Sequence, residues 1–214
     1  MTKKQAQKIL GSMLSCTSKM PCYSFNLSAL DCITGSKLVN VKGSSCHGCY
    51  ALKGNYARYK HPLKMQQAKK TEKINNKLWS NAMAYLINNQ GNKKDKNFFR
   101  WHDSGDLQSI DHLKKIVDVC NLTPNVKHWL PTREYKIVND YINQGNKIPQ
   151  NLVIRFSAHM IDQKPPKTQL NTSTIHHNKK FYGVECESYK NENECGDCRL
   201  CWDINTKNIS YKYH

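Results

Sequence analysis

The C-terminal part of the chain carries four cysteines that are spaced like the ligands of one metal centre. They fall within residues 186–201 and are Cys186, Cys195, Cys198 and Cys201. The last three are separated by two consecutive two-residue spacers, which are typical of iron–sulfur proteins, whereas structural zinc sites usually combine two separated pairs of ligands. Four thiolates are enough to hold one [4Fe–4S] cluster. The sequence therefore predicts an iron–sulfur centre here, with zinc as the alternative.

A second group of cysteines, Cys32, Cys46 and Cys49, lies nearer the N-terminus. Three thiolates on a four-iron cluster would leave one iron open for a substrate or cofactor, as catalytic zinc sites keep one position open. In a third arrangement, Cys46 and Cys49 join two of the C-terminal cysteines on a single metal. The spacing is compatible with one centre or with two. Cys120 falls on an apolar helix face and is expected in the core.

Five polar residues directly follow two of the predicted strands and are candidates for catalysis. They are His102, Asp103, Asp106, Arg133 and Glu134. A histidine beside carboxylates can do acid–base chemistry or bind a cation. An arginine can bind a phosphate or a carboxylate through two parallel hydrogen bonds.

Each of these residues also has a structural alternative. Asp106 or Ser109 could cap the following helix, with Gly105 making the turn. Arg133 could pair with Asp103 or Asp106 across the edge of the sheet. Of the two aspartates, Asp103 is the better catalytic candidate, because Asp106 suits the cap.

Alternating strand-like and helix-like segments predict an α/β fold with parallel strands. The predicted strands are residues 98–101, 126–130, 152–156 and 181–184, and the predicted helices between them lie around 110–120 and 137–142. Strand centres recur at intervals of about 25 to 28 residues, the length of one strand–helix unit. The chain is too short for eight units, so we expect a partial, trimmed β/α barrel with Cys-rich terminal segments, or else an open sheet. In either form, the polar strand ends meet at the carboxyl edge.

A long amphipathic helix is predicted over residues 62–88. Its apolar face consists of Ile74, Leu78, Ala82, Tyr85 and Leu86. The other face is rich in lysine and is expected to be solvated; it consists of Lys64, Lys69, Lys70, Lys73 and Lys77.

The length of 214 residues suits one domain, with a Cys-rich part (1–60), a β/α core (61–160) and a Pro-rich loop with the cysteine tail (161–214). The ten cysteines are not accompanied by a secretory signal or a membrane-spanning apolar run, so we expect metal ligands rather than disulfides. The net charge of +17 favours anionic partners such as nucleic acid, although an AT-rich genome alone would also favour the abundant Lys and Asn.

Six motifs, taken in order, resemble the "gene product 88" family of bacteriophage proteins. They are residues 19–25, Cys46–Gly54, Arg100–Asp106, Trp129–Glu134, Ile154–Ala158 and Cys195–Trp202. The resemblance implies a phage-encoded protein in the cytoplasm of a bacterial host and leaves its activity open. The Cys-Tyr-Ala element at Cys49 is also remotely similar to the cluster loop of radical S-adenosylmethionine enzymes, which are built on partial or full barrels. This similarity implies S-adenosylmethionine as a further cofactor, but those enzymes hold their three cysteines in one compact run.

Three functions are compatible with these observations. The first is an iron–sulfur enzyme acting on an anionic small molecule, a nucleotide or nucleic acid. The second is a nucleic-acid-binding protein whose metal centre is structural, and the third is a phage effector that binds a host protein.

Overall fold

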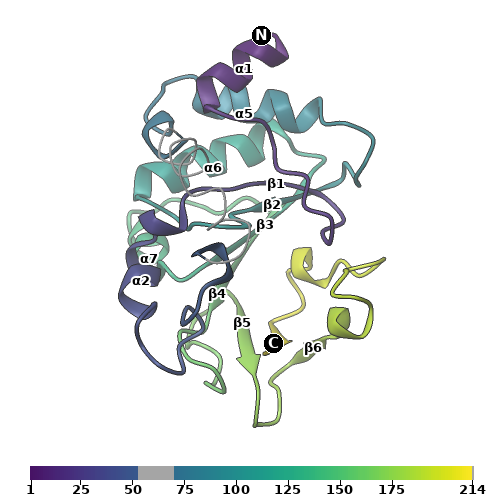
Figure 1. The fold of residues 1–214 in the computed structure, drawn as a ribbon. Helices are drawn as coiled ribbons and strands as arrows, with labels where there is room; N and C mark the ends of the chain where they lie inside the picture. Colours follow the sequence, from purple (N-terminus) through teal and green to yellow (C-terminus); the bar gives the residue numbers. More distant parts are fainter. Residues whose placement is uncertain (53–69, 214) are drawn as a thin grey trace.

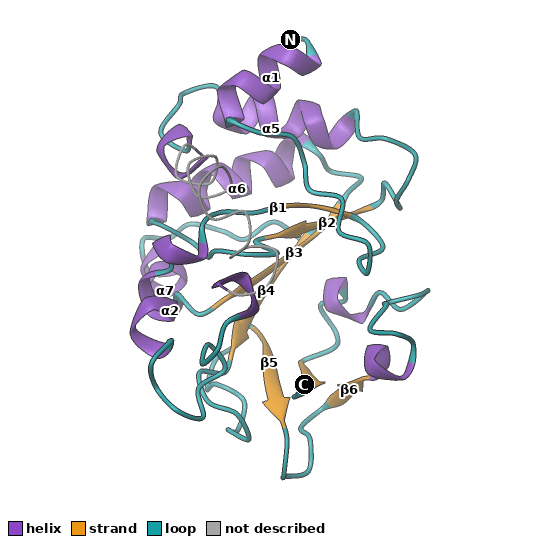
Figure 2. Cartoon of the chain, in the orientation of Figure 1, coloured by secondary structure: helices purple, strands orange, loops and turns teal. Residues whose placement is uncertain are grey.

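Seven strands form one sheet in the computed structural model, which describes residues 1–52 and 70–213. The strand order is β1-β2-β3-β4-β5-β7-β6, and every neighbouring pair is parallel. The strands are β1 (Tyr23–Phe25), β2 (Phe98–Trp101), β3 (Lys127–Thr132), β4 (Leu152–Ser157), β5 (Asn171–His176), β6 (Val184–Cys186) and β7 (Asn208–Lys212). The predicted α/β class is confirmed, and the sheet is open, with β1 and β6 at its two ends, rather than closed into a barrel (Figure 2).

Helices and short 3-10 turns connect the strands. The helices are α1 (Lys3–Leu10), α2 (Ile33–Leu38), α5 (Trp79–Asn88), α6 (Ile110–Leu122) and α7 (Tyr135–Asn143). The 3-10 turns are η1 (Ala29–Asp31), η2 (Tyr50–Leu52), η3 (Glu187–Lys190) and η4 (Leu200–Trp202). The predicted helices around 110–120 and 137–142 are confirmed as α6 and α7.

One face of the sheet, here called the helical face, packs against α1, α5, α6 and α7. Alternate strand residues point to it, such as Phe99 and Trp101 of β2, and they are fully buried together with Leu113 of α6. The opposite face carries Phe98 and Trp129 and is covered by the C-terminal segment, residues 187–206. Figure 1 shows α1, α5 and α6 on one side of the strands and this segment on the other.

The prediction of one helix over residues 62–88 is wrong within the described residues. Residues 74–78 form turns, and α5 begins only at Trp79. Residues 62–69 of the prediction lie outside the described part. The break has a local cause: the side chain of Asn76 accepts a hydrogen bond from the amide of Leu78, so the backbone turns instead of continuing as a helix.

Three strands were not predicted, namely β1, β5 and β7. The strand predicted at 181–184 lies instead at Val184–Cys186. β5 is buried although its first four residues are polar, Asn171 to Thr174. The side chains of Asn171, Thr172 and Thr174 bond to β7 or its preceding loop, for example from the Thr172 hydroxyl to the Asn208 side chain at 2.8 Å, and Ser173 bonds to Ser157 of β4.

Candidate functional site: two groups of thiols

Cys32, Cys46 and Cys49, here called the edge thiols, lie near one another at the carboxyl edge of the sheet. Cys32 is the N-cap residue of α2, and the amide of Cys49 bonds to the carbonyl of Cys46 in a tight turn. A β-carbon placed on Gly35 would lie 3.5 Å from the sulfur of Cys32 and 3.8 Å from that of Cys46. Two thiols that are far apart in the sequence therefore border the same small space.

Residues after β3 hold the loops that carry the edge thiols. The carboxylate of Glu134 accepts hydrogen bonds from the amide and the hydroxyl of Thr34, at 2.7 and 2.8 Å, in the first turn of α2. The guanidinium of Arg133 donates to the hydroxyl oxygen of Ser45, next to Cys46, at 2.9 and 3.1 Å. The amide of Ser45 in turn bonds to the carbonyl of His159 after β4. The ends of β3 and β4 thus position two separate cysteine loops.

Asp106 is buried beside the edge thiols and does not cap a helix. Its carboxylate accepts hydrogen bonds from the Thr132 hydroxyl at 2.6 Å and from the amide of Arg133 at 2.9 Å. Burial raises the pKa of Asp106 to about 6, and these hydrogen bonds oppose the shift. Ser109 provides the predicted cap of α6 instead.

Arg133 makes no ion pair with Asp103 or Asp106 among the residues that the structure describes. Its guanidinium binds Ser45 instead. Burial, then the charge of Asp106, raises the pKa of the Cys32 thiol to about 12, and Arg133 acts against this. Burial likewise raises the pKa of Cys46. Without a cation between them, these thiols stay protonated at neutral pH.

The other two candidate catalytic residues lie elsewhere. His102 has a left-handed backbone (φ 55°), and its imidazole is buried against Trp101 and His112. Burial, with the charges of His112 and Arg100, lowers its pKa well below the ordinary value, so the ring is neutral. Asp103 is buried, which raises its pKa, and the charges of Arg100 and Lys70 act in the opposite direction. Of the five predicted residues, Asp106, Arg133 and Glu134 therefore surround the edge thiols.

Lys70 is a residue that the sequence pattern assigned wrongly. It was expected on a solvated helix face, yet it is only 5% exposed. Its amine bonds to the side chain of Asn26 and lies 5.2 Å from the centre of the Phe25 ring. Burial lowers its pKa to about 8, although the charge of Asp103 raises it. No periodicity signal could have revealed this, since it depends on where the chain leaves β1.

Cys186, Cys195, Cys198 and Cys201, here called the segment thiols, lie on the opposite face. The amide of Cys198 bonds to the carbonyl of Cys195 in a turn, and the sulfur of Cys201 lies 3.3 Å from the Tyr211 hydroxyl. Burial, then the neighbouring thiols Cys186 and Cys198, raises the pKa of Cys195. The run therefore folds back on itself and brings its thiols together.

Arg155 of β4 anchors the segment to the sheet and is fully buried. Its guanidinium donates only to main-chain carbonyl oxygens: Thr172 (3.4 Å), Leu200 (2.9 Å), Cys201 (3.0 Å), Asp203 (2.8 Å) and Thr206 (2.7 Å). The indole of Trp202 adds a hydrogen bond to the carbonyl of Phe99. The positions of Leu200 and Cys201 are thus fixed by one charged side chain.

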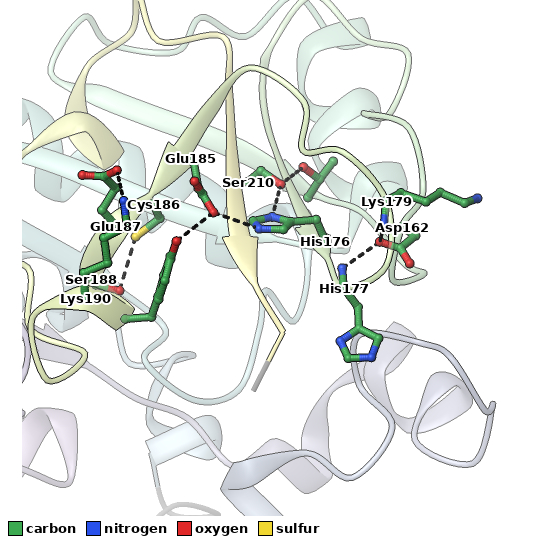
Figure 3. A network of polar contacts seen from close by, with 12 residues as sticks. Asp162, His176, His177, Lys179, Glu185, Cys186, Glu187, Ser188, Lys190 and Ser210 are labelled. Atoms are coloured by element: carbon green, nitrogen blue, oxygen red, sulfur yellow. Dashed lines mark hydrogen bonds and ion pairs between the residues drawn. The ribbon is translucent and has the colours of Figure 1, made fainter.

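A polar network joins β5, β6 and β7, and Cys186 lies next to its member Glu185 in β6 (Figure 3). The imidazole of His176 lies 2.9 Å from the Ser210 hydroxyl and 3.1 Å from the carboxylate of Glu185. This resembles a serine–histidine–acid arrangement, but Ser210 is fully buried and unavailable to a substrate. The hydrogen bonds of His176 join β5 to Glu185 of β6 and to Ser210 of β7, and in this way they align β6 and its last residue, Cys186.

The thiols of each group are near one another but are not arranged around a metal. Within residues 1–52 and 70–213, no three His, Cys, Asp or Glu side chains form a group that could hold a metal ion. All ten cysteines are free thiols. The charges that act on Cys46 come from Arg133, Cys49 and Asp106, all of them at the carboxyl edge.

A groove of about 530 Å³ opens next to the edge thiols. Its lining includes Lys42, His47, Met160, His177 and Tyr213. His47 is adjacent to Cys46 in the sequence, so a molecule in this groove would lie beside the thiols. Asp162 lines the groove as well, so the lining carries one lysine and one aspartate beside its aromatic and apolar side chains.

The architecture defines a class: a parallel α/β protein with one group of cysteines at the carboxyl edge of the sheet and another on the opposite face. The chain belongs to the Gene product 88 family, whose model matches residues 1–204. This confirms the bacteriophage family that the motifs predicted. No match was found among curated proteins or solved structures.

No helix in the described ranges is long and apolar enough to cross a membrane. A location in the host cytoplasm and binding of a host protein stay predictions.

Proposed function

We propose that this phage protein binds iron–sulfur clusters at two centres. The segment thiols hold a [4Fe–4S] cluster with a structural role, and the edge thiols hold a second cluster with one iron open. The observation that carries the proposal is that Cys32 and Cys46, separated in sequence, border one space beside Arg133, while the segment thiols gather around a separate turn. Free thiols in two groups are the donor set that such clusters require.

The chemistry of the surroundings supports thiolate ligands in both places. A cluster with four thiolate ligands is an anionic group, and cations beside it stabilise its charge. Arg100 and Arg199 act on Cys195, and Arg133 acts on Cys32. The sulfurs must move inward to bind, which is expected because metal sites are rarely preformed without their metal. Of the segment thiols, Cys195 and Cys198 lie on a turn and Cys201 on the 3-10 element η4, whereas Cys186 ends β6.

We further propose that the edge centre is catalytic and acts on a nucleotide or another anionic molecule. With three protein ligands, the bound cluster would supply a Lewis-acidic iron with one free position. Arg133 is already held by Ser45 and lies beside the thiols, and Lys42 lines the neighbouring groove. Asp106, with its pKa raised to about 6, is suited to exchange a proton near neutral pH. S-adenosylmethionine is one candidate for the groove.

The test is metal analysis of the full chain produced and purified without oxygen. Two clusters predict about eight iron and eight sulfide per chain. The Cys46→Ser and Cys198→Ser variants should each lose about half, and Cys16→Ser, at an exposed thiol outside both groups, should lose none. A chain with one zinc and no sulfide, or full iron content in Cys198→Ser, would contradict the proposal. Binding of S-adenosylmethionine to the reduced, loaded chain tests the catalytic part.

A second candidate function is binding of nucleic acid, favoured by a basic groove of about 340 Å³. Four cationic residues line it: Lys19, Lys93, Lys94 and Arg199. Asp95 and Glu194 also line it, and the net charge of the chain is +17. DNA or RNA binding should weaken steeply with salt, and the Lys19→Gln/Lys93→Gln variant should lower the slope of log affinity against log salt by about 2. Affinity that does not change with salt would exclude this function.

A further inference from the structure

We infer that Cys22, a residue outside the cysteine run, is a ligand of the segment centre together with Cys195, Cys198 and Cys201. The inference rests on the proposed iron–sulfur function and changes its ligand set. In this arrangement Cys186 is the spare thiol. The centre then joins the N-terminal and C-terminal parts of the chain.

The first argument is the location of Cys22. It is fully buried directly before β1, within a cluster formed with Trp129 and Trp202, and Cys201 packs against this cluster. The chain just before it lies along the cysteine turn, since the amide of Cys195 bonds to the carbonyl of Lys19 at 3.3 Å. Cys22 thus belongs to the cluster that Cys201 packs against, and it is close enough to Cys195 for their charges to interact.

The second argument concerns what holds this contact in place. The amide of Asp95 bonds to the carbonyl of Pro21, next to Cys22, and the Asp95 carboxylate pairs with Arg199 at 3.3 Å. Arg199 lies between Cys198 and Cys201 in the sequence, and its guanidinium bonds back to the carbonyls of Gly196 and Cys198. One acidic residue therefore ties the loop of Cys22 to the loop of the segment thiols.

The third argument is charge. Arg100 and Arg199 both act on Cys22 and on Cys195, so two cations serve the same pair of thiols. Arg100 stacks on Trp129, 4.8 Å from the ring centre, and so belongs to the wall of the same buried cluster. The two guanidinium groups are thus placed where they would stabilise the negative charge of a cluster bound by these thiols.

Cys186 also lies near Cys195 and Cys201, but its sulfur already has a hydrogen-bond partner. Its sulfur donates to the hydroxyl of Ser188 at 3.4 Å, at the end of the edge strand β6. By contrast, no hydrogen bond involves the sulfur of Cys22 within the described ranges. Within these ranges, the sulfur of Cys22 therefore has no hydrogen bond that a metal centre would have to replace, whereas that of Cys186 would have to give up Ser188.

The experiment measures iron and sulfide in a Cys32→Ser/Cys46→Ser/Cys49→Ser background, where only the segment centre remains. Adding Cys22→Ala should remove most of the remaining iron, and Cys22→Ser should remove it or change the electron paramagnetic resonance of the reduced cluster. Adding Cys186→Ser should leave both readouts unchanged. Cys120→Ala is the matched control, because Cys120 is also fully buried but lies on the helical face.

Loss of iron in Cys186→Ser with retention in Cys22→Ala would overturn the inference and leave the iron–sulfur proposal intact. Retention of iron in both Cys22→Ala and Cys186→Ser would overturn the inference as well. If Cys22→Ala and Cys120→Ala lose iron equally, the loss reflects packing and the inference fails. A parent chain without iron would instead refute the proposed function.

Discussion

The two faces of the sheet are built from different interactions. The helical face is an apolar core in which Trp79, Trp101 and Leu113 are fully buried. The opposite face has a small apolar cluster around Trp129 and Trp202, and its cover is held by the buried guanidinium of Arg155. Burial of apolar area stabilises the helical face whether or not a metal is bound. The opposite face depends on the polar anchor Arg155 and, under the proposed function, also on bound metal.

This difference explains why the cysteines gather where they do. An irregular segment with few large apolar side chains gains little from burial and needs another source of stability. Hydrogen bonds to a buried arginine supply part of it, and thiolate–metal bonds would supply the rest. The following predictions test this contrast.

The largest effect is expected for Arg155→Met. It leaves main-chain carbonyls at Leu200, Cys201 and Thr206 without their donor, which should cost on the order of 4 kcal/mol. Hydrogen exchange should rise first in residues 187–206. Lys127→Met, at an exposed position of the neighbouring strand, should change stability by less than about 0.5 kcal/mol. If residues 187–206 are equally protected from hydrogen exchange in the two variants, Arg155 does not anchor this segment.

On the helical face, Leu113→Ala should lower the free energy of unfolding by about 3 kcal/mol, because it leaves a cavity in the apolar core. Urea titration gives this value. If the two faces are as distinct as described, the folded variant keeps the iron content of the wild type. Loss of iron from a fully folded Leu113→Ala chain would break the distinction.

The helical face should also lose stability in acid. Burial lowers the pKa of His112 to about 3 from its ordinary value of 6.5, so the ring is neutral when folded. As the pH falls below 6.5, His112 binds a proton in the unfolded chain but stays neutral in the folded chain. The free energy of unfolding therefore falls by up to about 1.4 kcal/mol per pH unit until the pH nears 3. Urea midpoints at several pH values should show a shallower dependence in His112→Phe. An unchanged slope would mean that the ring is charged when folded.

The smallest effect concerns the carboxyl edge. Thr34→Val removes the hydroxyl bond to Glu134 and should cost about 1 kcal/mol. In the metal-free chain, labelling of Cys32 should become faster, while that of Cys201 stays the same. Ser36→Ala, which removes a hydroxyl bonded within α2, is the control. Faster labelling of both thiols would mean that the edge and the opposite face are coupled.

Much of the central fold could be read from the sequence. The apolar segments that became β2, β3 and β4, and the helical patterns of α6 and α7, have the periodicity that burial on one face imposes. β5 and β7 could not be found this way, because their buried side chains are satisfied by hydrogen bonds to each other, as between Thr174 and Ser210. Such polar pairing has no signature in either strand alone.

The sequence by itself determined the bacteriophage family and the parallel α/β class, since the order of motifs and the periodicity of apolar residues can be read along the chain. Only the tertiary structure decided how these parts meet. It set the segment thiols on the opposite face, beside Cys22, and it separated His102 from Asp106 although both follow the same strand. The reason is physical: which side chains share a space depends on packing and on long-range hydrogen bonds, such as those of Arg155 and Glu134.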